Sequence, residues 1–170
     1  MIIVVIGVTG AGKSTIGAAL AERLGWRFIE GDDFHSEANW RKLERGIPLT
    51  DADRAPWLER LRQELAQALS RGESAVLACS ALRQAYRDAL VPPGARAKDV
   101  RFVHLDAAPS VFESRLAKRT GHRASAALLQ SQLDLFEPAS DALRVNAADS
   151  PDRIVQTIVS TWGLDGQPQK

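Results

Sequence analysis

The sequence has a single cysteine, Cys79, among its 170 residues. A disulfide framework within the chain is therefore excluded, and such sparing use of cysteine is typical of proteins that work in a reducing compartment. Because Cys79 lies in an apolar run, we expect it to be a small buried residue and not a reactive thiol.

Long apolar runs are also missing. The run Ile2–Ile6 contains only five residues, which is too few for the apolar core of a secretory signal, and no stretch approaches the roughly 20 apolar residues of a membrane span. We therefore expect a cytoplasmic protein without a membrane partner.

Neither sign of charge predominates, because 22 lysines and arginines face 21 aspartates and glutamates. A net charge of +1 provides no strong field for nucleic acid, so the expected partner is a small anion bound by particular arginines. With 45% apolar residues, residues 1–170 are long enough for one compact α/β domain.

What the sequence does contain is a glycine-rich segment, Gly7–Ser14, directly after the apolar run. Ile16, Leu20 and Leu24 follow it at helical spacing. Strand, glycine loop and helix form the context of a Walker A motif. The glycines allow successive backbone N–H groups to surround a polyphosphate, and the positive end of the helix dipole points at the same anion.

This segment predicts ATP and Mg²⁺ as cofactors. Lys13 is expected to reach the β- and γ-phosphates, and the Ser14 hydroxyl to bind the Mg²⁺ between them. The residues predicted to bind the nucleotide here are Gly7, Thr9, Gly10, Ala11, Gly12, Lys13, Ser14 and Thr15.

Two carboxylates, Asp32 and Asp33, follow a predicted second strand at residues 26–30. Ligands of open α/β sheets bind beyond the carboxyl ends of the strands, so either carboxylate could deprotonate a substrate hydroxyl or hold a magnesium-bound water. They could equally cap the next helix, and the local sequence leaves both interpretations open. His35, a lone histidine in the same loop, is a weaker candidate.

Residues 35–72 are predicted to form an insertion over the sheet that recognises the substrate. A polar helix is expected at 36–45, then a connector at 47–57, with Pro56 in the first turn of the next helix. Arg54 would lie at the unfavourable positive end of that helix, which suggests that an anion binds it.

The remaining strands are predicted at 73–79, 100–105 and 143–145, the last at a sheet edge. The strand at 73–79 would bring Ser80 to the rim of the site. Asp106 is interpreted as the cap of the helix at 110–118 and not as a Walker B carboxylate. Further helices are expected at 84–90 and 125–136 and around Ile154 to Trp162.

A basic cluster surrounds Gly121 between two predicted helices; its members are Arg115, Lys118, Arg119, His122 and Arg123. Such a cluster suits a lid, here residues 119–126, that closes over bound triphosphate and stabilises the transferred group. The alternative is an ordinary solvated helix end. Arg115 and Arg119 are predicted to contact the nucleotide, and Arg119 to act in catalysis.

Together these features resemble the small P-loop kinases of nucleoside monophosphates and shikimate, and within that group the gluconokinases. The similarity extends from Ile3 to about Trp162. It rests on residues 7–14, 31–35 with Asn39 and Lys42, 46–58, 79–82 with 86–88, 119–122, Ser131 and Gln132, and Glu137 and Pro138. The chain departs from the gluconokinase pattern at Arg83, usually lysine, and at Arg123 and Ala124, usually Phe-Met.

The resemblance implies a three-layer P-loop kinase fold, in which a five-stranded parallel sheet of order 2-3-1-4-5 has helices on both faces and a mobile lid. It implies phosphorylation of gluconate by ATP, with Asp32 at the reacting hydroxyl. Arg54 and Arg87 would hold the substrate carboxylate, with His35 and Ser80 nearby. A homodimer is possible by the same resemblance. Shikimate or nucleotide acceptors, and a non-catalytic ATP-binding switch, remain alternatives.

Overall fold

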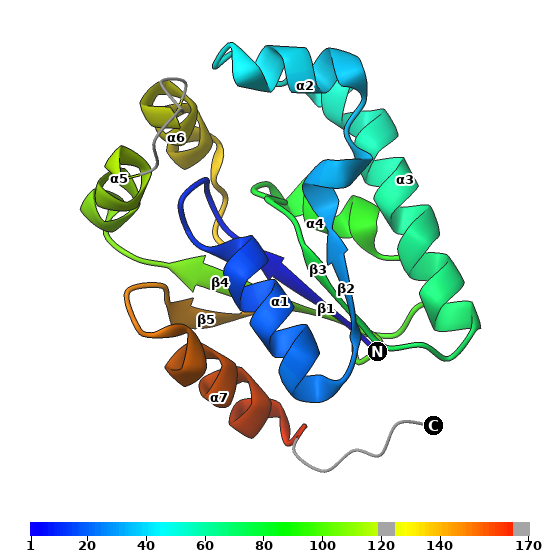
Figure 1. Ribbon diagram of the computed structural model, residues 1–170. Coiled ribbons are helices and arrows are strands. Elements are labelled where there is room, and N and C mark those ends of the chain that lie inside the picture. The colour runs from blue at the N-terminus through cyan, green and yellow to red at the C-terminus, as the bar shows by residue number, and fades with distance from the viewer. Residues whose placement is uncertain (119–124, 165–170) are drawn as a thin grey trace.

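The computed structural model describes residues 1–118 and 125–164 and is built around one parallel sheet (Figure 1). The strands are β1 (Ile2–Ile6), β2 (Arg27–Glu30), β3 (Ala75–Ala78), β4 (Val100–Asp106) and β5 (Ala142–Asn146). Their order is β2-β3-β1-β4-β5, and every neighbouring pair is parallel. The predicted strand order is confirmed, with β5 at an edge.

Helices cover both faces of this sheet (Figure 1). They are α1 (Lys13–Leu24), α2 (Glu37–Glu44), α3 (Asp51–Ser70), α4 (Gln84–Leu90), α5 (Pro109–Ala117), α6 (Ser125–Leu135) and α7 (Pro151–Trp162), with a short 3₁₀ helix, η1 (Gly31–Phe34). Helices α1 and α7 lie on one face, and α3 and α4 on the other. No helix in the described part of the chain has the length and apolar character needed to span a membrane.

The central strand β1 divides the core between the two faces. Its five residues are fully buried; Ile3 and Val5 pack toward α1 and α7, whereas Ile2, Val4 and Ile6 pack toward α3. Alternating side chains thus reach both layers of helices, which is why the strand is apolar throughout.

Cys79, directly after β3, is completely buried, as predicted. Burial raises the pKa of its thiol to about 12. The thiolate is therefore strongly disfavoured, and Cys79 acts as a small core residue.

The start of α3 differs from the sequence prediction. The sequence pattern places residues 47–57 in a connector and starts the helix near Pro56. In the structure the helix begins at Asp51, because Thr50 and Asp53 form a capping box. The Thr50 hydroxyl accepts from the Asp53 N–H, and the Asp53 carboxylate accepts from the Thr50 N–H. Pro56 consequently lies inside the helix beyond its first turn, where it removes one helical N–H, while the reciprocal cap fixes the start of the helix at Asp51.

Asp106 was also predicted incorrectly as a helix cap. It is the last residue of β4, and its carboxylate accepts a hydrogen bond of 2.6 Å from Arg144 Nε of β5. Ala108 occupies the N-cap of α5. The pairing of β4 with β5 therefore includes Asp106, one residue beyond the predicted strand at 100–105.

Candidate active site

The phosphate loop connects β1 to α1 in the predicted manner. Gly10 and Gly12 have φ angles of 80° and 95°, a region that strongly favours glycine, and Gly12 is the N-cap of α1. Ser14 and Thr15 are exposed in the first turn of the helix. Lys13 Nζ donates a hydrogen bond of 3.0 Å to the Val8 carbonyl, so the lysine folds back over the loop. The backbone conformation fits an anion cradle.

A cavity of about 220 Å³ adjoins this loop. Gly10, Gly12 and Thr15 line one side, and Ala147, Asp149 and Pro151 of the β5–α7 connection line the other. Arg115 of α5 bridges the two sides, because its guanidinium donates to the Ala11 and Ala147 carbonyls. The predicted position of Arg115 beside the nucleotide loop agrees with this geometry. The sequence pattern did not predict that residues 147–151 line this cavity. The one feature that could have indicated it is their position directly after a strand of the parallel sheet.

A hydrogen bond links the phosphate loop to the helix that follows the predicted lid. The Thr9 N–H donates to Gln132 Oε1 of α6 at 2.6 Å. Thr9 therefore already has an acceptor for its N–H in this structure. Arg119 and most of the predicted lid, residues 119–124, lie outside the described residues.

Asp32 lies in η1 at the carboxyl end of β2. The indole Nε1 of Trp57 donates to the Gly31 carbonyl at 2.8 Å and anchors η1 to α3. The Asp32 side chain is 54% exposed. Although it lies near the start of a helical turn, its side chain does not cap η1; Glu30 accepts the Asp32 N–H instead. The carboxylate is thus available to a ligand.

His35 joins Asp32 to the insertion. Its ring stacks on Trp57 with centroids 4.3 Å apart, and His35 Nε2 lies 3.9 Å from Asp32 Oδ1. Burial lowers the pKa of His35, while Asp32 opposes this shift and Arg54 and Arg60 add to it. A neutral imidazole packed on Trp57 is best suited to orient the Asp32 loop.

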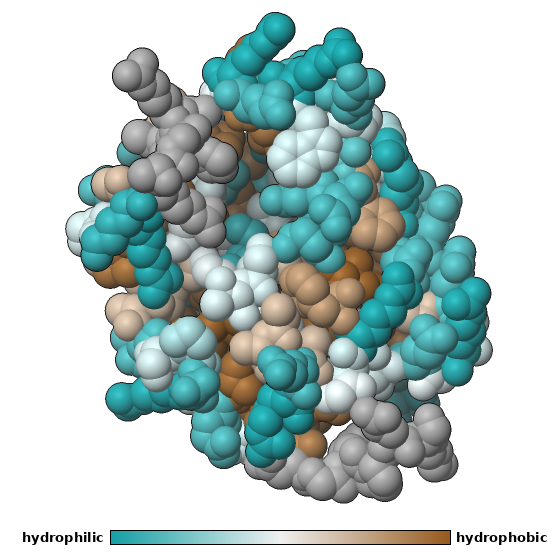
Figure 2. Space-filling view, viewed as in Figure 1, coloured by the Kyte–Doolittle hydropathy of each residue, from teal (hydrophilic) through white to brown (hydrophobic). Residues whose placement is uncertain are grey.

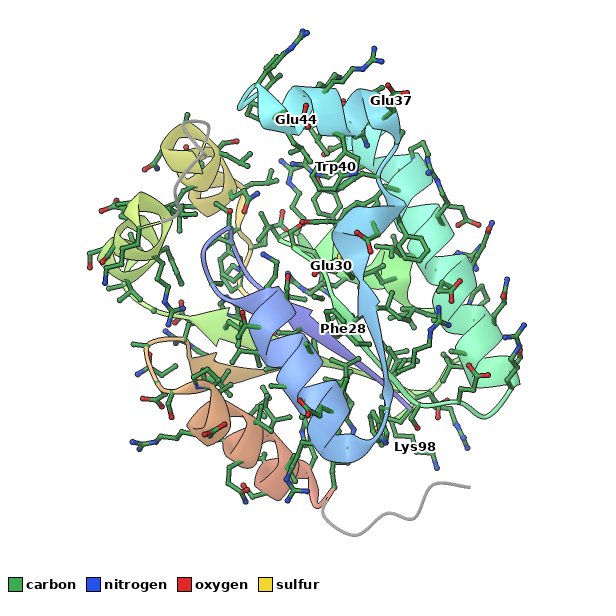
Figure 3. All side chains as sticks on the ribbon, viewed as in Figure 1. Phe28, Glu30, Glu37, Trp40, Glu44 and Lys98 are labelled. Carbon is green, nitrogen blue, oxygen red and sulfur yellow. The ribbon has the colours of Figure 1, made fainter. Side chains whose placement is uncertain are left out.

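The insertion is tied together by polar contacts between α2 and α3. Lys42 Nζ binds both carboxylate oxygens of Asp53, at 2.7 and 2.8 Å, and lowers the pKa of Asp53 to about 2 together with the Thr50 donors. Asn39 donates to the Asp53 carbonyl. Figure 3 shows Trp40 extending from α2 toward the sheet, and its ring packs edge-on against His35, with centroids 6.1 Å apart. Hydrophilic side chains cover α2 (Figure 2).

The structure gives the predicted substrate arginines very different surroundings. Arg54 is near the carboxyl ends of the strands; it donates to the Leu49 carbonyl, and its Nη1 lies 4.0 Å from Asp51 and 3.4 Å from Tyr86 Oη. Ser80 is half-buried after β3, at the expected rim. The anion that the sequence argument required for Arg54 is supplied here by Asp51.

Arg87 has no exposed surface. Its guanidinium donates to the carbonyls of Ala81, Leu82 and Pro138 and to Gln84 Oε1. The expectation that Arg87 binds a substrate carboxylate directly does not fit this arrangement, because the side chain is fully buried and both of its Nη groups already donate to other parts of the protein. The charge pattern alone could not distinguish a buried arginine from a ligand-binding one.

A phosphate loop after the first strand of a parallel 2-3-1-4-5 sheet, with a carboxylate beyond a neighbouring strand, defines the class of P-loop kinases. The family model described as "AAA domain" matches residues 2–139. A gluconokinase of Gluconobacter oxydans is 43% identical to this chain over 92% of the chain and 88% of its own length. The chain belongs to the gluconokinase family and is a kinase.

Two solved structures extend this similarity to the fold. A sugar kinase from Janibacter sp. superposes with a TM-score of 0.85 at 38% identity, covering 96% of this chain and 95% of its own. A gluconokinase from Sinorhizobium meliloti superposes with a TM-score of 0.79 at 38% identity, covering 97% of each chain. The similarity therefore includes the insertion as well as the phosphate loop.

Proposed function

We propose that this protein transfers the γ-phosphoryl group of ATP to a hydroxyl of gluconate, giving 6-phosphogluconate and ADP. The observation that carries the proposal is the meeting of two charges at one edge of the sheet. Asp32 follows the carboxyl end of β2 in η1, and Lys13 begins α1 beyond the carboxyl end of β1; only β3 separates these two parallel strands. A carboxylate for the acceptor and a cation for the phosphates thus lie at the same edge of the sheet.

The residues around the phosphate loop fit MgATP. The backbone of residues 10–14 would surround the phosphates, Lys13 would move from the Val8 carbonyl to the transferred group, and the cavity beside Arg115 would receive the base. Ser14 would bind Mg²⁺, which prefers a few protein oxygens supplemented by phosphates and water. When bound, Mg²⁺ neutralises charge on the phosphates.

Asp32 would accept the hydroxyl proton of gluconate while that oxygen bonds to the γ-phosphorus and the bond to ADP breaks. His35 and Trp57 hold the loop that carries Asp32. Arg119 is proposed to stabilise charge on the transferred group from the lid, as arginines do in other phosphoryl transfers.

A panel of acceptors tests the proposal directly. ADP release would be measured with gluconate, shikimate, nucleoside monophosphates and no acceptor. We expect gluconate to give the highest kcat/KM. Faster turnover of shikimate or a nucleotide would contradict the gluconate assignment. ATP binding without any acceptor-dependent turnover would favour the alternative that the protein is a non-catalytic ATP-binding switch. The homodimer, the cytoplasmic location and the absence of a nucleic-acid partner stay predictions.

A further inference from the structure

Four charged or polar side chains from the starts of α3 and α4 meet at the acceptor side of the site. Asp51 is the first residue of α3, Arg54 lies one turn later, Arg83 is the N-cap of α4, and Tyr86 follows within α4. Both segments begin at the edge of the sheet where the phosphate loop lies (Figure 1). We call these four residues the carboxylate cluster.

At the centre of the cluster is the carboxylate of Asp51. Tyr86 Oη donates to Asp51 Oδ1, and Arg83 Nη1 donates to Asp51 Oδ2 at 3.0 Å. Both guanidinium groups also lie over the Tyr86 ring, at 5.4 Å for Arg54 and 5.9 Å for Arg83. The protein has thus assembled two cations and a phenol around one carboxylate, which is the donor set that recognises carboxylates in general.

The carboxylate is the most exposed member of the cluster. Tyr86 is 7% exposed, the Arg54 side chain 12% and the Arg83 side chain 38%, whereas the Asp51 side chain is 66% exposed. Within the described part of the chain, the hydrogen-bond and ion-pair partners of the Asp51 carboxylate all belong to the cluster, and the capping of α3 depends on Thr50 and Asp53 instead. Asp51 can therefore turn into solvent without unfolding its helix.

The other carboxylate near Arg83 is less exchangeable. Glu137 Oε1 lies 4.0 Å from Arg83 Nε. Its other oxygen, Oε2, accepts the N–H of Gln84 at 2.8 Å and so caps the start of α4. Asp51 is consequently the anion that a ligand would displace.

We propose that Arg54, Arg83 and Tyr86 form the subsite for the carboxylate of the sugar acid, and that Asp51 fills this subsite while no acceptor is bound. The inference rests on the proposed function and deepens it. Arg83, not the buried Arg87, is the second guanidinium of the subsite. Asp51 competes with the acceptor, so that the subsite keeps its donors paired and its geometry fixed between turnovers.

Arg83→Met and Asp51→Asn test the two parts of the proposal. Arg83→Met should raise KM for gluconate about tenfold or more, with KM for ATP unchanged, because a charge-assisted contact is lost. Since the Arg83 side chain makes no capping bond to α4, the fold should survive. Asp51→Asn should lower KM for gluconate about threefold at unchanged kcat, because the competitor is weakened.

Arg62→Met and Asp88→Asn are the matched controls, because Arg62 pairs with Glu59 on the outside of α3 and Asp88 with Gln84 on α4. Both should leave both KM values unchanged. An unchanged KM for gluconate in Arg83→Met would overturn the subsite. A raised KM in Asp51→Asn would overturn the competition and make Asp51 part of the binding surface.

A second measurement does not depend on turnover. The carboxyl carbon of Asp51 would be followed by NMR in the full chain during titration with gluconate and with glucitol, which lacks the carboxylate. We expect the Asp51 signal to shift with gluconate only, and a response to neither would overturn the subsite. If gluconate is phosphorylated but the Asp51 signal does not shift, the proposed function stands and the subsite is rejected. If the Asp51 signal shifts but gluconate is not phosphorylated, the subsite stands and the proposed function is rejected.

Discussion

The phosphate loop and the acceptor region reach the same edge of the sheet by different routes. The loop is one continuous segment, residues 7–14, whose conformation follows from its glycines and its flanking strand and helix. The acceptor region combines η1 with the starts of α3 and α4, joined by contacts such as Trp57 with Gly31 and Tyr86 with Asp51. A local site tolerates change elsewhere, whereas an assembled site depends on the packing that joins its parts.

The largest effect is expected from Asp32→Asn, in the acceptor region. If Asp32 accepts the hydroxyl proton, kcat should fall about 10³-fold while ATP binding is retained, because the amide cannot take up the proton. Steady-state kinetics and ATP titration measure both quantities. Asp33→Asn, at the neighbouring exposed carboxylate, is the control. Near-normal kcat in Asp32→Asn would remove Asp32 from the chemistry.

In the phosphate loop, Lys13→Ala should lower kcat about 10²-fold or more, because one donor to the developing charge is lost. Thermal unfolding should change little, because the bond from Lys13 to the Val8 carbonyl lies within the phosphate loop itself. Lys98→Ala is the control, because Lys98 is exposed at the end of the molecule remote from α2 (Figure 3). An active Lys13→Ala enzyme would contradict the assignment of the loop.

Arg87→Lys tests whether the acceptor region depends on buried packing. The lysine cannot serve all four acceptors of the guanidinium, so the free energy of unfolding should fall by about 3 kcal/mol. Urea unfolding measures this loss, with exposed Arg62→Lys as the reference. A normal unfolding free energy combined with a raised KM for gluconate would restore the direct substrate role for Arg87.

Trp57→Phe should have a smaller effect on stability. It retains an aromatic ring for stacking on His35 but leaves the Gly31 carbonyl without its donor, which should cost about 1–2 kcal/mol. Because η1 carries Asp32, kcat should fall as well, whereas KM for ATP should not change. Trp162→Phe, on the opposite α7, should affect neither kinetic constant. Equal kcat values in the two variants would show that the indole bond does not position Asp32.

The smallest effect concerns pH. Burial lowers the pKa of His35 below its usual 6.5, so the folded state prefers the neutral ring more than the unfolded chain does. This contribution to stability is complete above pH 6.5 and is lost as the pH falls through the lowered pKa. His35→Gln should therefore reduce the decline in unfolding free energy between pH 7.5 and pH 5.

Part of that decline should persist in His35→Gln, because burial also lowers the pKa of His104. His104 stacks on Phe136 with centroids 4.6 Å apart. Unfolding curves of His104→Gln at the same two pH values provide the comparison. An unchanged decline in His35→Gln would mean that the pKa of His35 is the same in both states.

The strands and the phosphate loop could be predicted from the sequence, and the strand order could be predicted from the family resemblance. These features depend on short-range signals: apolar runs set the strands, and adjacent glycines, a lysine and a helical pattern set the loop. The capping box at Thr50 and Asp53 was also a local signal, although Pro56 obscured it.

The fold, and not the sequence pattern, sets which of the arginines lie beside Asp51 at the edge of the sheet. Arg54, Arg83 and Arg87 are equivalent cations in the sequence, but folding buries Arg87 among carbonyls and brings the other two to Asp51. Asp106 likewise takes its partner from β5 instead of its own helix. The physical reason is that the partner of a long charged side chain is set by packing between distant segments, which no periodicity within one segment records.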